Sequence, residues 1–147
     1  MRLFTGCGVA VVTALLAACG GSDEDRWSGP PAPDADGVVS VETFDTYRET
    51  VDESWEQAPV LVAAEFVKLE ERTAGKTSIV GSGGSGDDGP ETVTIELTEL
   101  LDDAVRAERW VLIIEPVSET FRLVSATRTL QCQPDRGHEN FAPEPCS

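Results

Sequence analysis

The chain has 147 residues, of which 27 are acidic and 11 are Lys or Arg, so its formal net charge is −16. This length allows one domain and excludes a multidomain enzyme. The negative charge and the lack of a basic cluster argue against nucleic acid and against an anionic membrane surface as partners. Because 40% of the residues are hydrophobic, the chain can still build a core, and wholesale disorder is not expected.

The first nineteen residues have the features of an export signal. Arg2 is followed by an apolar run over residues 9–16, which is too short for the roughly 20 residues that span a bilayer. The run ends in the sequence Leu-Ala-Ala-Cys at residues 16–19, which resembles a bacterial lipobox. The resemblance implies that residues 1–18 are a lipoprotein signal peptide and that the Cys19 thiol accepts a diacylglycerol.

Such a lipoprotein is held at the extracytoplasmic face of the cell membrane by at least two acyl chains, because one chain alone binds only marginally. Loss of residues 1–18 removes Arg2 and no acidic residue, so the formal charge falls from −16 to −17. An ordinary secretory peptide cleaved near Ala18, with Cys19 unmodified, is the alternative.

Two cysteines remain for the folded part, Cys132 and Cys146, once Cys7 is discarded and Cys19 is acylated. An oxidising, exported location predicts that they form a disulfide. The closed loop of about 15 residues would contribute roughly 3 kcal/mol in the chain-entropy model. A metal site is the alternative, but His138 is the only imidazole, so Cys and His cannot complete a tetrahedral ligand set. We expect no metal and no cofactor.

Residues 19–37 are predicted to form an acidic tether rich in Pro and Gly, ahead of a single domain over residues 38–147. The Pro-rich stretch at 30–33 favours extended backbone, and the like charges around it repel one another. Trp27 is the one large apolar side chain in this stretch, and we interpret it as incidental.

A helix is predicted over residues 44–55, followed by a second helical segment. Four large apolar side chains recur at helical spacing in the first of these: Phe44, Tyr47, Val51 and Trp55. We interpret this stripe as core packing. Pro59 ends the helix or opens the next one, which runs to Glu70, and the charged residues 68–72 are interpreted as its solvated end.

Four strands are predicted in the rest of the chain. Short strands over 77–80 and around 92–97 flank a flexible glycine-rich loop over 81–90, and the runs 105–115 and 120–132 form a hairpin. A helix or helical hairpin followed by antiparallel strands predicts an α+β fold, and this element order favours an NTF2-like or cystatin-like architecture. The disulfide would staple the C-terminal tail to the last strand.

Few residues match known chemical motifs. The glycines of 81–86 have the spacing of a dinucleotide-binding loop, but the Asp-Asp-Gly-Pro that follows cannot start a helix and would repel a pyrophosphate. The acid pairs at 87–88 and 102–103 are interpreted as solvated surface charge, with calcium binding as the alternative. No catalytic set is identified.

One cluster could carry chemistry: Arg136 and His138 beside the predicted disulfide, with Trp110 and Phe141 near it in sequence. Arg and His on a stapled loop could bind an anion or donate a proton. The structural alternative is that Gly137 permits a tight turn, Arg136 pairs with acids and His138 caps backbone groups.

The tail also carries a family resemblance. It is similar to the tail of small, uncharacterised lipoproteins and secreted proteins of high-GC Gram-positive bacteria, and six residues match that pattern: Cys132, Arg136, Gly137, His138, Phe141 and Cys146. Asp135 stands where the pattern has Gly. The similarity extends back through residues 102–105 and Trp55, and it implies no known activity.

We therefore expect a membrane-anchored lipoprotein whose non-catalytic domain binds another envelope protein or a small ligand, and not nucleic acid. The alternative is a ligand-binding cone or a hydrolase-like enzyme that uses His138 and Arg136.

Overall fold

The computed structural model describes residues 26–83 and 89–147. A short strand, β1 (Val38–Val39), precedes a helical segment that contains α1 (Glu42–Arg48), the 3-10 helix η2 (Ser54–Gln57), α2 (Pro59–Val67) and the 3-10 helix η3 (Leu69–Glu71). Four long strands follow: β2 (Lys76–Gly83), β3 (Glu91–Thr98), β4 (Val105–Val117) and β5 (Thr120–Cys132). This is the α+β fold expected from the sequence.

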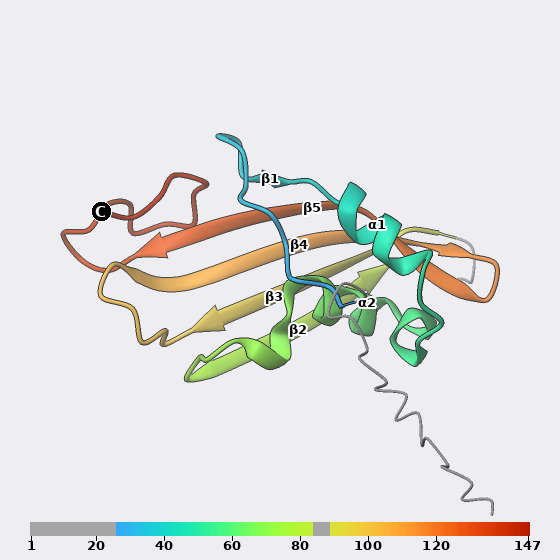
Figure 1. Cartoon of the computed structure of the whole chain (residues 1–147). Helices are drawn as coiled ribbons and strands as arrows, with labels where there is room; N and C mark the ends of the chain where they lie inside the picture. Colours follow the sequence, from blue (N-terminus) through green and yellow to red (C-terminus); the bar gives the residue numbers. More distant parts are fainter. Residues whose placement is uncertain (1–25, 84–88) are drawn as a thin grey trace, which may run out of the picture.

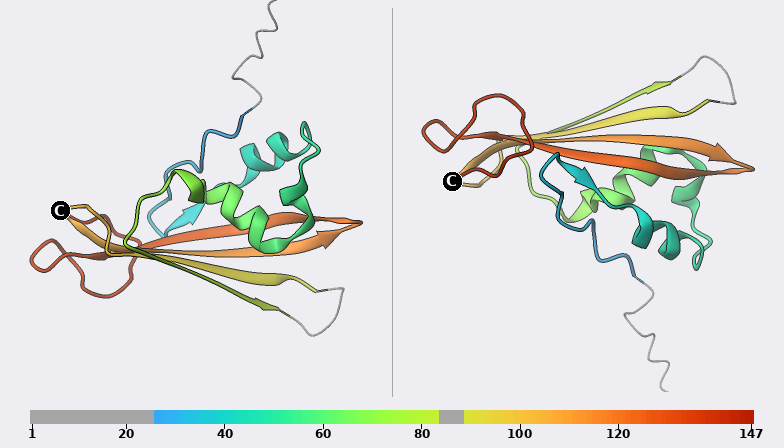
Figure 2. Two further views of the ribbon diagram at one scale, coloured as in Figure 1. Left: turned by 90° about the horizontal axis from the view of Figure 1, so that it is seen from below. Right: turned by 90° about the horizontal axis from the view of Figure 1, so that it is seen from above.

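The strands form one antiparallel sheet in the order β1-β5-β4-β3-β2 (Figure 1). Helices α1 and α2 lie on the same side of it (Figure 2). The alternation that predicted β3 is borne out, because Val93, Ile95 and Leu97 are buried under the helices while Thr92, Thr94 and Glu96 are half-buried on the opposite face. The core therefore lies between the helices and one face of the sheet.

The single helix predicted over residues 44–55 is wrong, because α1 ends at Arg48 and η2 begins at Ser54. Thr50, Val51 and Asp52 are poor helix formers, and the Thr50 hydroxyl donates to the Tyr47 carbonyl. The side chain of Glu53 caps η2, and that of Glu56 bonds back to the Glu53 backbone. The aromatic stripe still joins the core, as predicted.

Trp27 corrects the predicted tether. Its side chain is buried, its ring packs edge-on against Phe44 at 5.0 Å between centroids, and its Nε1 donates to the Phe66 carbonyl at 2.9 Å. A buried indole with a satisfied N–H is a core residue. Residues from Trp27 to Gly37 therefore belong to the domain and not to the tether.

The predicted solvated end over 68–72 is also wrong in part. Lys68 is buried, has φ of 56° as the left-handed cap of α2, and pairs with Glu65 at 3.1 Å. Arg72 reaches inward to the carboxylate of Glu108. Pro59 takes the second of its two predicted roles: it occupies the first turn of α2, where its missing N–H costs nothing.

The connections differ slightly from those predicted. Strand β2 extends to Gly83, so the loop after it begins later than residue 81, and β4 continues to Val117, which leaves a two-residue turn at 118–119. Beyond β5, a bridge between Leu130 and Ala142 brings the tail back alongside that strand.

Several predictions fall outside the described residues: the signal peptide over 1–18, the acylation site Cys19, residues 20–25 of the tether, and residues 84–88 of the glycine-rich loop. Within residues 26–83 and 89–147, every helix is too short or too polar to cross a bilayer.

Candidate functional site

A buried carboxylate, Glu108, is the centre of an ion-pair cluster on β4. Its side chain is 5% exposed and lies on the helix-covered face, two residues before Trp110. It accepts hydrogen bonds from Arg72 Nη1 at 3.1 and 3.2 Å, from Arg128 Nε at 2.8 Å and from Trp110 Nε1 at 2.6 Å. Such complete pairing is what allows a carboxylate to be buried.

The two arginines also contact the indole of Trp110. Each guanidinium carbon lies 5.7 Å from the ring centroid, a distance at which a cation is attracted to the ring face. Arg72 Nε additionally donates to the Val67 carbonyl at 3.2 Å. Two guanidinium groups around one carboxylate leave the cluster with a formal charge of +1, in a chain whose net charge is −16.

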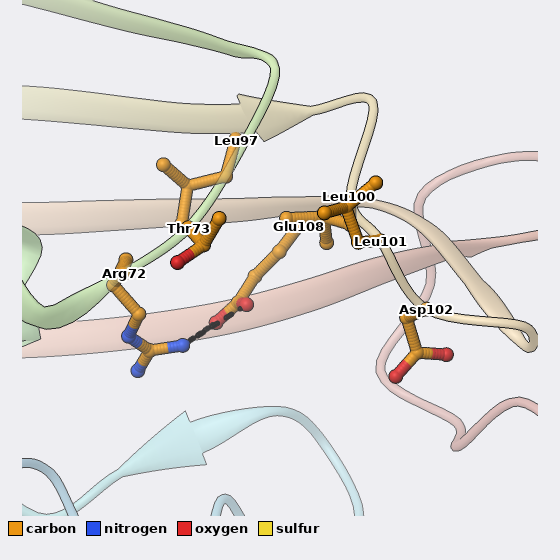
Figure 3. Close-up of a pocket in the computed structure, with 7 residues that line it drawn as sticks. All are labelled: Arg72, Thr73, Leu97, Leu100, Leu101, Asp102 and Glu108. Carbon is orange, nitrogen blue, oxygen red and sulfur yellow. Dashed lines mark hydrogen bonds and ion pairs between the residues drawn. The ribbon is translucent and has the colours of Figure 1, made fainter.

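A cavity of about 410 Å³ opens beside this cluster (Figure 3). It is lined by Arg72, Thr73, Leu97, Leu100, Leu101, Asp102 and Glu108. Leu97 forms part of the buried floor, whereas Leu101 is 92% exposed at the loop between β3 and β4. The cavity therefore combines an apolar wall with charged groups.

Asp102 is held in a fixed position at one end of this cavity. Its Oδ1 accepts hydrogen bonds from the backbone N–H groups of Ala104 at 2.8 Å and Val105 at 2.7 Å. These two bonds lower the pKa of the Asp102 carboxyl, so the group is negatively charged at neutral pH. The acid pair at 102–103, predicted as solvated charge, includes one residue with a defined local structure.

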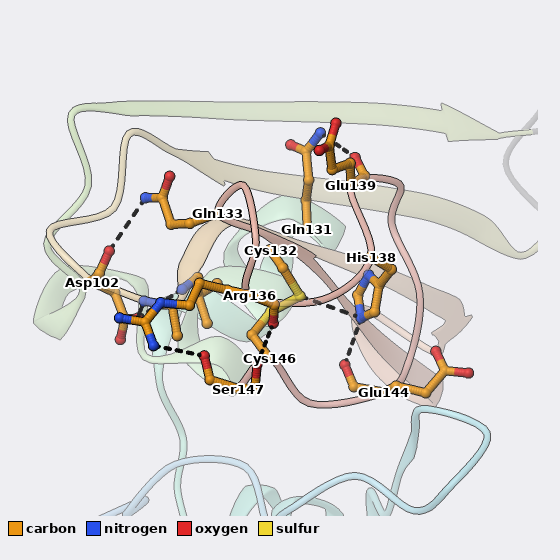
Figure 4. Close-up of a disulfide and its surroundings, with 12 residues drawn as sticks. Asp102, Gln131, Cys132, Gln133, Arg136, His138, Glu139, Glu144, Cys146 and Ser147 are labelled. Carbon is orange, nitrogen blue, oxygen red and sulfur yellow. Dashed lines mark hydrogen bonds between the residues drawn. A yellow bond between two sulfur atoms is a disulfide. The ribbon is translucent and has the colours of Figure 1, made fainter.

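The tail forms a second cluster around the disulfide between Cys132 and Cys146, whose Cα atoms are 5.5 Å apart (Figure 4). The disulfide predicted from the cysteine count is therefore present. Gly137 has φ of 137° and lies so close that a Cβ there would be 3.0 Å from Cys132 Sγ. A glycine is needed at this turn, as the sequence indicated.

His138 uses both ring nitrogens within the tail. Nδ1 lies 2.8 Å from the Asn140 carbonyl oxygen and Nε2 lies 2.9 Å from the Glu144 carbonyl oxygen. Carbonyl oxygens only accept, so both nitrogens can donate at once only when the imidazole is protonated. The bonds to Glu144 and Asn140 accordingly raise the pKa of His138 above its usual 6.5.

Arg136 is bound at the chain end. It donates to the Ser147 carbonyl at 3.4 Å and faces Asp103 at 3.8 Å, while Ser147 donates back to the Arg136 carbonyl. Asp135, which replaces the Gly of the family pattern, has φ of 66°, in the left-handed region that favours glycine. The Arg136 and His138 contacts are those of the structural alternative.

Trp110 corrects the predicted binding cluster. It is 1% exposed beneath the helices and bonds Glu108, whereas Arg136 and His138 lie in the tail after β5. Trp110 therefore offers no surface that a ligand could share with those two residues. In the sequence, Trp110 marks the core, because it is an aromatic residue on the inward face of a strand.

The sequence interpretation missed the residues around Glu108. Glu108 precedes Trp110, Leu112 and Ile114 at a period of two, which places a charged residue on the buried face of β4. A carboxylate on a buried face needs partners, so its position in the alternation could have predicted a buried ion-pair cluster. Its partners Arg72 and Arg128 are distant in sequence.

A three-residue group near the disulfide has the composition of a metal site. The candidate ligand atoms of Cys132, His138 and Cys146 lie within 4.8 Å of one another. Both sulfurs are joined in the disulfide, and a metal ligand must be a thiolate. The oxidised tail therefore cannot bind a metal through this sulfur pair.

Comparison of the chain with models of protein families, with curated proteins and with solved structures found no match.

Proposed function

We propose that the chain is a lipid-anchored protein of the cell envelope whose domain binds another protein through the sheet face that the helices leave uncovered. The observation that carries this proposal is an uncharged patch on that face, in a chain of net charge −16. The anchor itself is inferred from the lipobox resemblance at residues 16–19.

The uncharged patch is made of two adjacent rows of side chains across four strands. The rows follow the strand register: Val80, Thr94, Val111 and Thr127 in one, and Ser82, Thr92, Ile113 and Ser125 in the other. Val80 is 57% exposed and Ile113 is 38% exposed. These β-branched and hydroxyl side chains form an uncharged surface of short side chains.

Charged residues next to the patch are neutralised locally. Glu96 and Arg109, in the neighbouring row, pair at 2.8 Å, and Glu115 pairs with Arg122 beyond the opposite row. Depletion of charge at the centre, with polar groups at the rim, is characteristic of protein–protein interfaces. The partner that fits is a protein with a complementary, uncharged surface of its own.

The burial of Trp27 supports a location close to the membrane. Trp27 lies eight positions after Cys19, and a fully extended chain over that distance spans at most about 29 Å. A tether that ran to residue 37 would reach roughly twice as far. The partner is therefore expected in the same membrane or directly above it.

The anchor is tested by mass spectrometry of the protein purified from membranes. We expect an N-terminal Cys19 with a diacylglyceryl thioether and residues 1–18 absent. The variant Cys19→Ala should lose the lipid and leave the membrane fraction. An unmodified thiol at Cys19, or a membrane-bound Cys19→Ala variant, would refute the anchor.

The binding face is tested with a photoreactive amino acid placed at Thr94, within the patch, and at Leu61, an exposed residue on α2. We expect a defined protein adduct from position 94 and none from position 61. Val80→Glu should abolish the adduct without changing thermal stability, and Leu61→Glu should leave it intact. Equal labelling from both positions would refute the proposed interface.

We further propose that the domain has the cystatin-like variant of the architectures expected from element order. The support is that strands β2 to β5 form an uninterrupted antiparallel meander after the helical segment. An experimental structure that showed a flat sheet with no wrapping around α2 would contradict this.

A further inference from the structure

We propose that a cavity on the uncovered sheet face binds a phosphomonoester group through Lys76 and Arg106. The cavity has a volume of about 290 Å³. It is lined by Lys76, Thr98, Glu99, Arg106, Ala107 and Gln131. The row of side chains that contains Glu96 and Arg109 separates it from the uncharged patch, so this inference does not depend on the proposed protein interface.

The cavity follows one row of side chains across four strands. The register pairs Lys76 with Thr98, Thr98 with Ala107, and Ala107 with Gln131. Neighbouring strands are about 4.8 Å apart, so the Lys76 and Ala107 backbones are roughly 10 Å apart. The long side chains of Lys76 and of Arg106, which precedes Ala107, can therefore meet one ligand above Thr98.

A β-bulge brings Arg106 to this cavity. Val105 pairs with Cys132 and Ala107 pairs with Gln131, so Arg106 is an extra residue in β4. In a regular strand, successive side chains point to opposite faces, and Arg106 would be separated from Ala107. The two residues nevertheless line the same cavity, because a bulge redirects a side chain.

The observation that carries the proposal is the pairing of the cations. Among the residues that the structure describes, Lys76 and Arg106 are the Lys and Arg side chains that form no ion pair with a carboxylate, although the chain has 27 acidic residues. The paired ones are Arg26, Arg48, Lys68, Arg72, Arg109, Arg122, Arg128 and Arg136. Both unpaired cations line one cavity.

One acid, Glu99, also lines the cavity, and its carboxylate lies against the chain backbone. Its Oε2 would be only 2.6 Å from a Cβ at Gly75, so the absence of a side chain there leaves room for the carboxylate. Glu99 itself has φ of 56°, a conformation that costs energy in a residue other than glycine and is found at ligand sites. With two cations and one acid, the lining has a formal charge of +1.

Two unpaired cations favour a phosphomonoester over a carboxylate. A phosphomonoester carries a charge of about −1.5 to −2 at neutral pH and has three strong acceptor oxygens, whereas a carboxylate carries one charge. The Arg106 guanidinium suits two of those oxygens, and the Lys76 ammonium and the Thr98 hydroxyl supply further donors. The volume of about 290 Å³ leaves room for a small organic group on the phosphate.

The test is isothermal titration calorimetry on the full chain in detergent micelles. Both a soluble phosphomonoester and the headgroup of phosphatidic acid carry the proposed group, so the probes are glycerol 3-phosphate and dihexanoyl phosphatidic acid. Acetate and dihexanoyl phosphatidylcholine are the controls for charge and for partition into the micelle. We expect a phosphomonoester to bind at least about tenfold more tightly than either control.

The two probes distinguish the source of the phosphate. Equal binding of both probes assigns the site to soluble phosphomonoesters, and binding of phosphatidic acid alone assigns it to a lipid headgroup. Either result supports the proposal. Lack of binding of both probes at millimolar concentration would overturn it, and so would an equal affinity for acetate.

Four substitutions connect binding to the proposed residues. Lys76→Gln and Arg106→Gln should each weaken binding about tenfold, because each removes a charge-assisted contact, whereas Lys76→Arg should retain it. Glu99→Gln should tighten binding, because it removes the negative charge of the lining. The matched control is Arg136→Gln, which removes one positive charge from the tail and should leave the affinity unchanged.

Unchanged affinity in Arg106→Gln would overturn the site. Equal weakening by Arg136→Gln would also overturn it, because binding would then follow net charge and not this cavity. Circular dichroism spectra and thermal unfolding of each variant establish that lost binding is not lost folding.

Discussion

The domain holds two clusters of charged groups, one around Glu108 and one around His138, and they are stabilised in opposite ways. Glu108 is buried, and its partners are side chains from the segment after α2 and from β5. His138 lies in the tail, and its partners are backbone carbonyls only two and six residues away. The first cluster joins distant parts of the fold, and the second organises one loop.

This difference predicts how far a perturbation should spread. Removal of a partner from the Glu108 cluster leaves uncompensated charge under the helices. Removal of a partner from the tail exposes groups that water can satisfy. The following changes, in decreasing order of expected effect, test that distinction.

Glu108→Ala should have the largest effect. It leaves two guanidinium groups and the Trp110 N–H without their acceptor, so we expect the free energy of unfolding to fall by about 3–5 kcal/mol. Urea denaturation followed by tryptophan fluorescence measures this. Glu108→Gln, which keeps an acceptor oxygen, should cost less.

The matched control is Glu96→Ala, which removes another carboxylate paired with an arginine at 2.8 Å, but one that is 33% exposed. We expect it to cost no more than about 1 kcal/mol. Similar losses for the two variants would mean that burial does not distinguish Glu108.

Loss of the disulfide should come second. The combined Cys132→Ser and Cys146→Ser variant opens a loop with a sequence separation of 14, for which the chain-entropy model gives roughly 3 kcal/mol. Because the tail is attached to β5, to the loop between β3 and β4 and to Arg109, and not to the helices, hydrogen exchange should increase in residues 133–147 and stay unchanged around Glu108. Increased exchange under α2 would show that the two clusters are coupled.

Protonation of His138 should have a smaller effect, confined to the tail. Its folded-state pKa is raised, so the charged form stabilises the fold below the unfolded pKa of about 6.5, and this stabilisation is lost as pH rises through the folded pKa. A titration of the imidazole by NMR should give a pKa above 6.5.

His138→Gln serves as the comparison in unfolding experiments over the same pH range. The difference in stability between the wild type and this variant should shrink as pH rises. A pKa at or below 6.5, or a pH-independent difference, would contradict the doubly donating imidazole.

Arg136→Gln should have the smallest effect. Its ion pair with Asp103 spans 3.8 Å, and Asp103 is 91% exposed. Exposed pairs contribute little, so we expect a change below about 0.5 kcal/mol in urea unfolding. A cost above 1.5 kcal/mol would place Arg136 among the residues that hold the tail.

Elements with a strong local pattern could be predicted from the sequence. The alternation of Val93, Ile95 and Leu97 identified β3, and the run that contains Trp110 identified β4. Pro59 marked the start of α2. The number of cysteines identified the partner of Cys132, because the expected loss of Cys7 and acylation of Cys19 leave only one other candidate for it.

The candidate site could not be predicted in the same way. The apolar residues continue at helical spacing past Arg48, so nothing in the sequence pattern indicated that α1 ends there. The helix ends because the Thr50 hydroxyl competes for the Tyr47 carbonyl, which hydrophobic periodicity does not report. Trp27 stands alone in a Pro- and Gly-rich stretch, and its burial depends on Phe44 and Phe66. The residues next to Trp27 in the sequence therefore could not predict that it packs against these two rings.

The sequence by itself determined the strand pattern, the acidic surface and the disulfide, because each follows from neighbouring residues or from a simple count. The tertiary structure alone decided that Glu108 is buried between Arg72 and Arg128, 36 and 20 residues away. It also placed Lys76 and Arg106 on one cavity. The physical reason is that a buried charge and a binding cavity depend on which distant side chains the fold brings together.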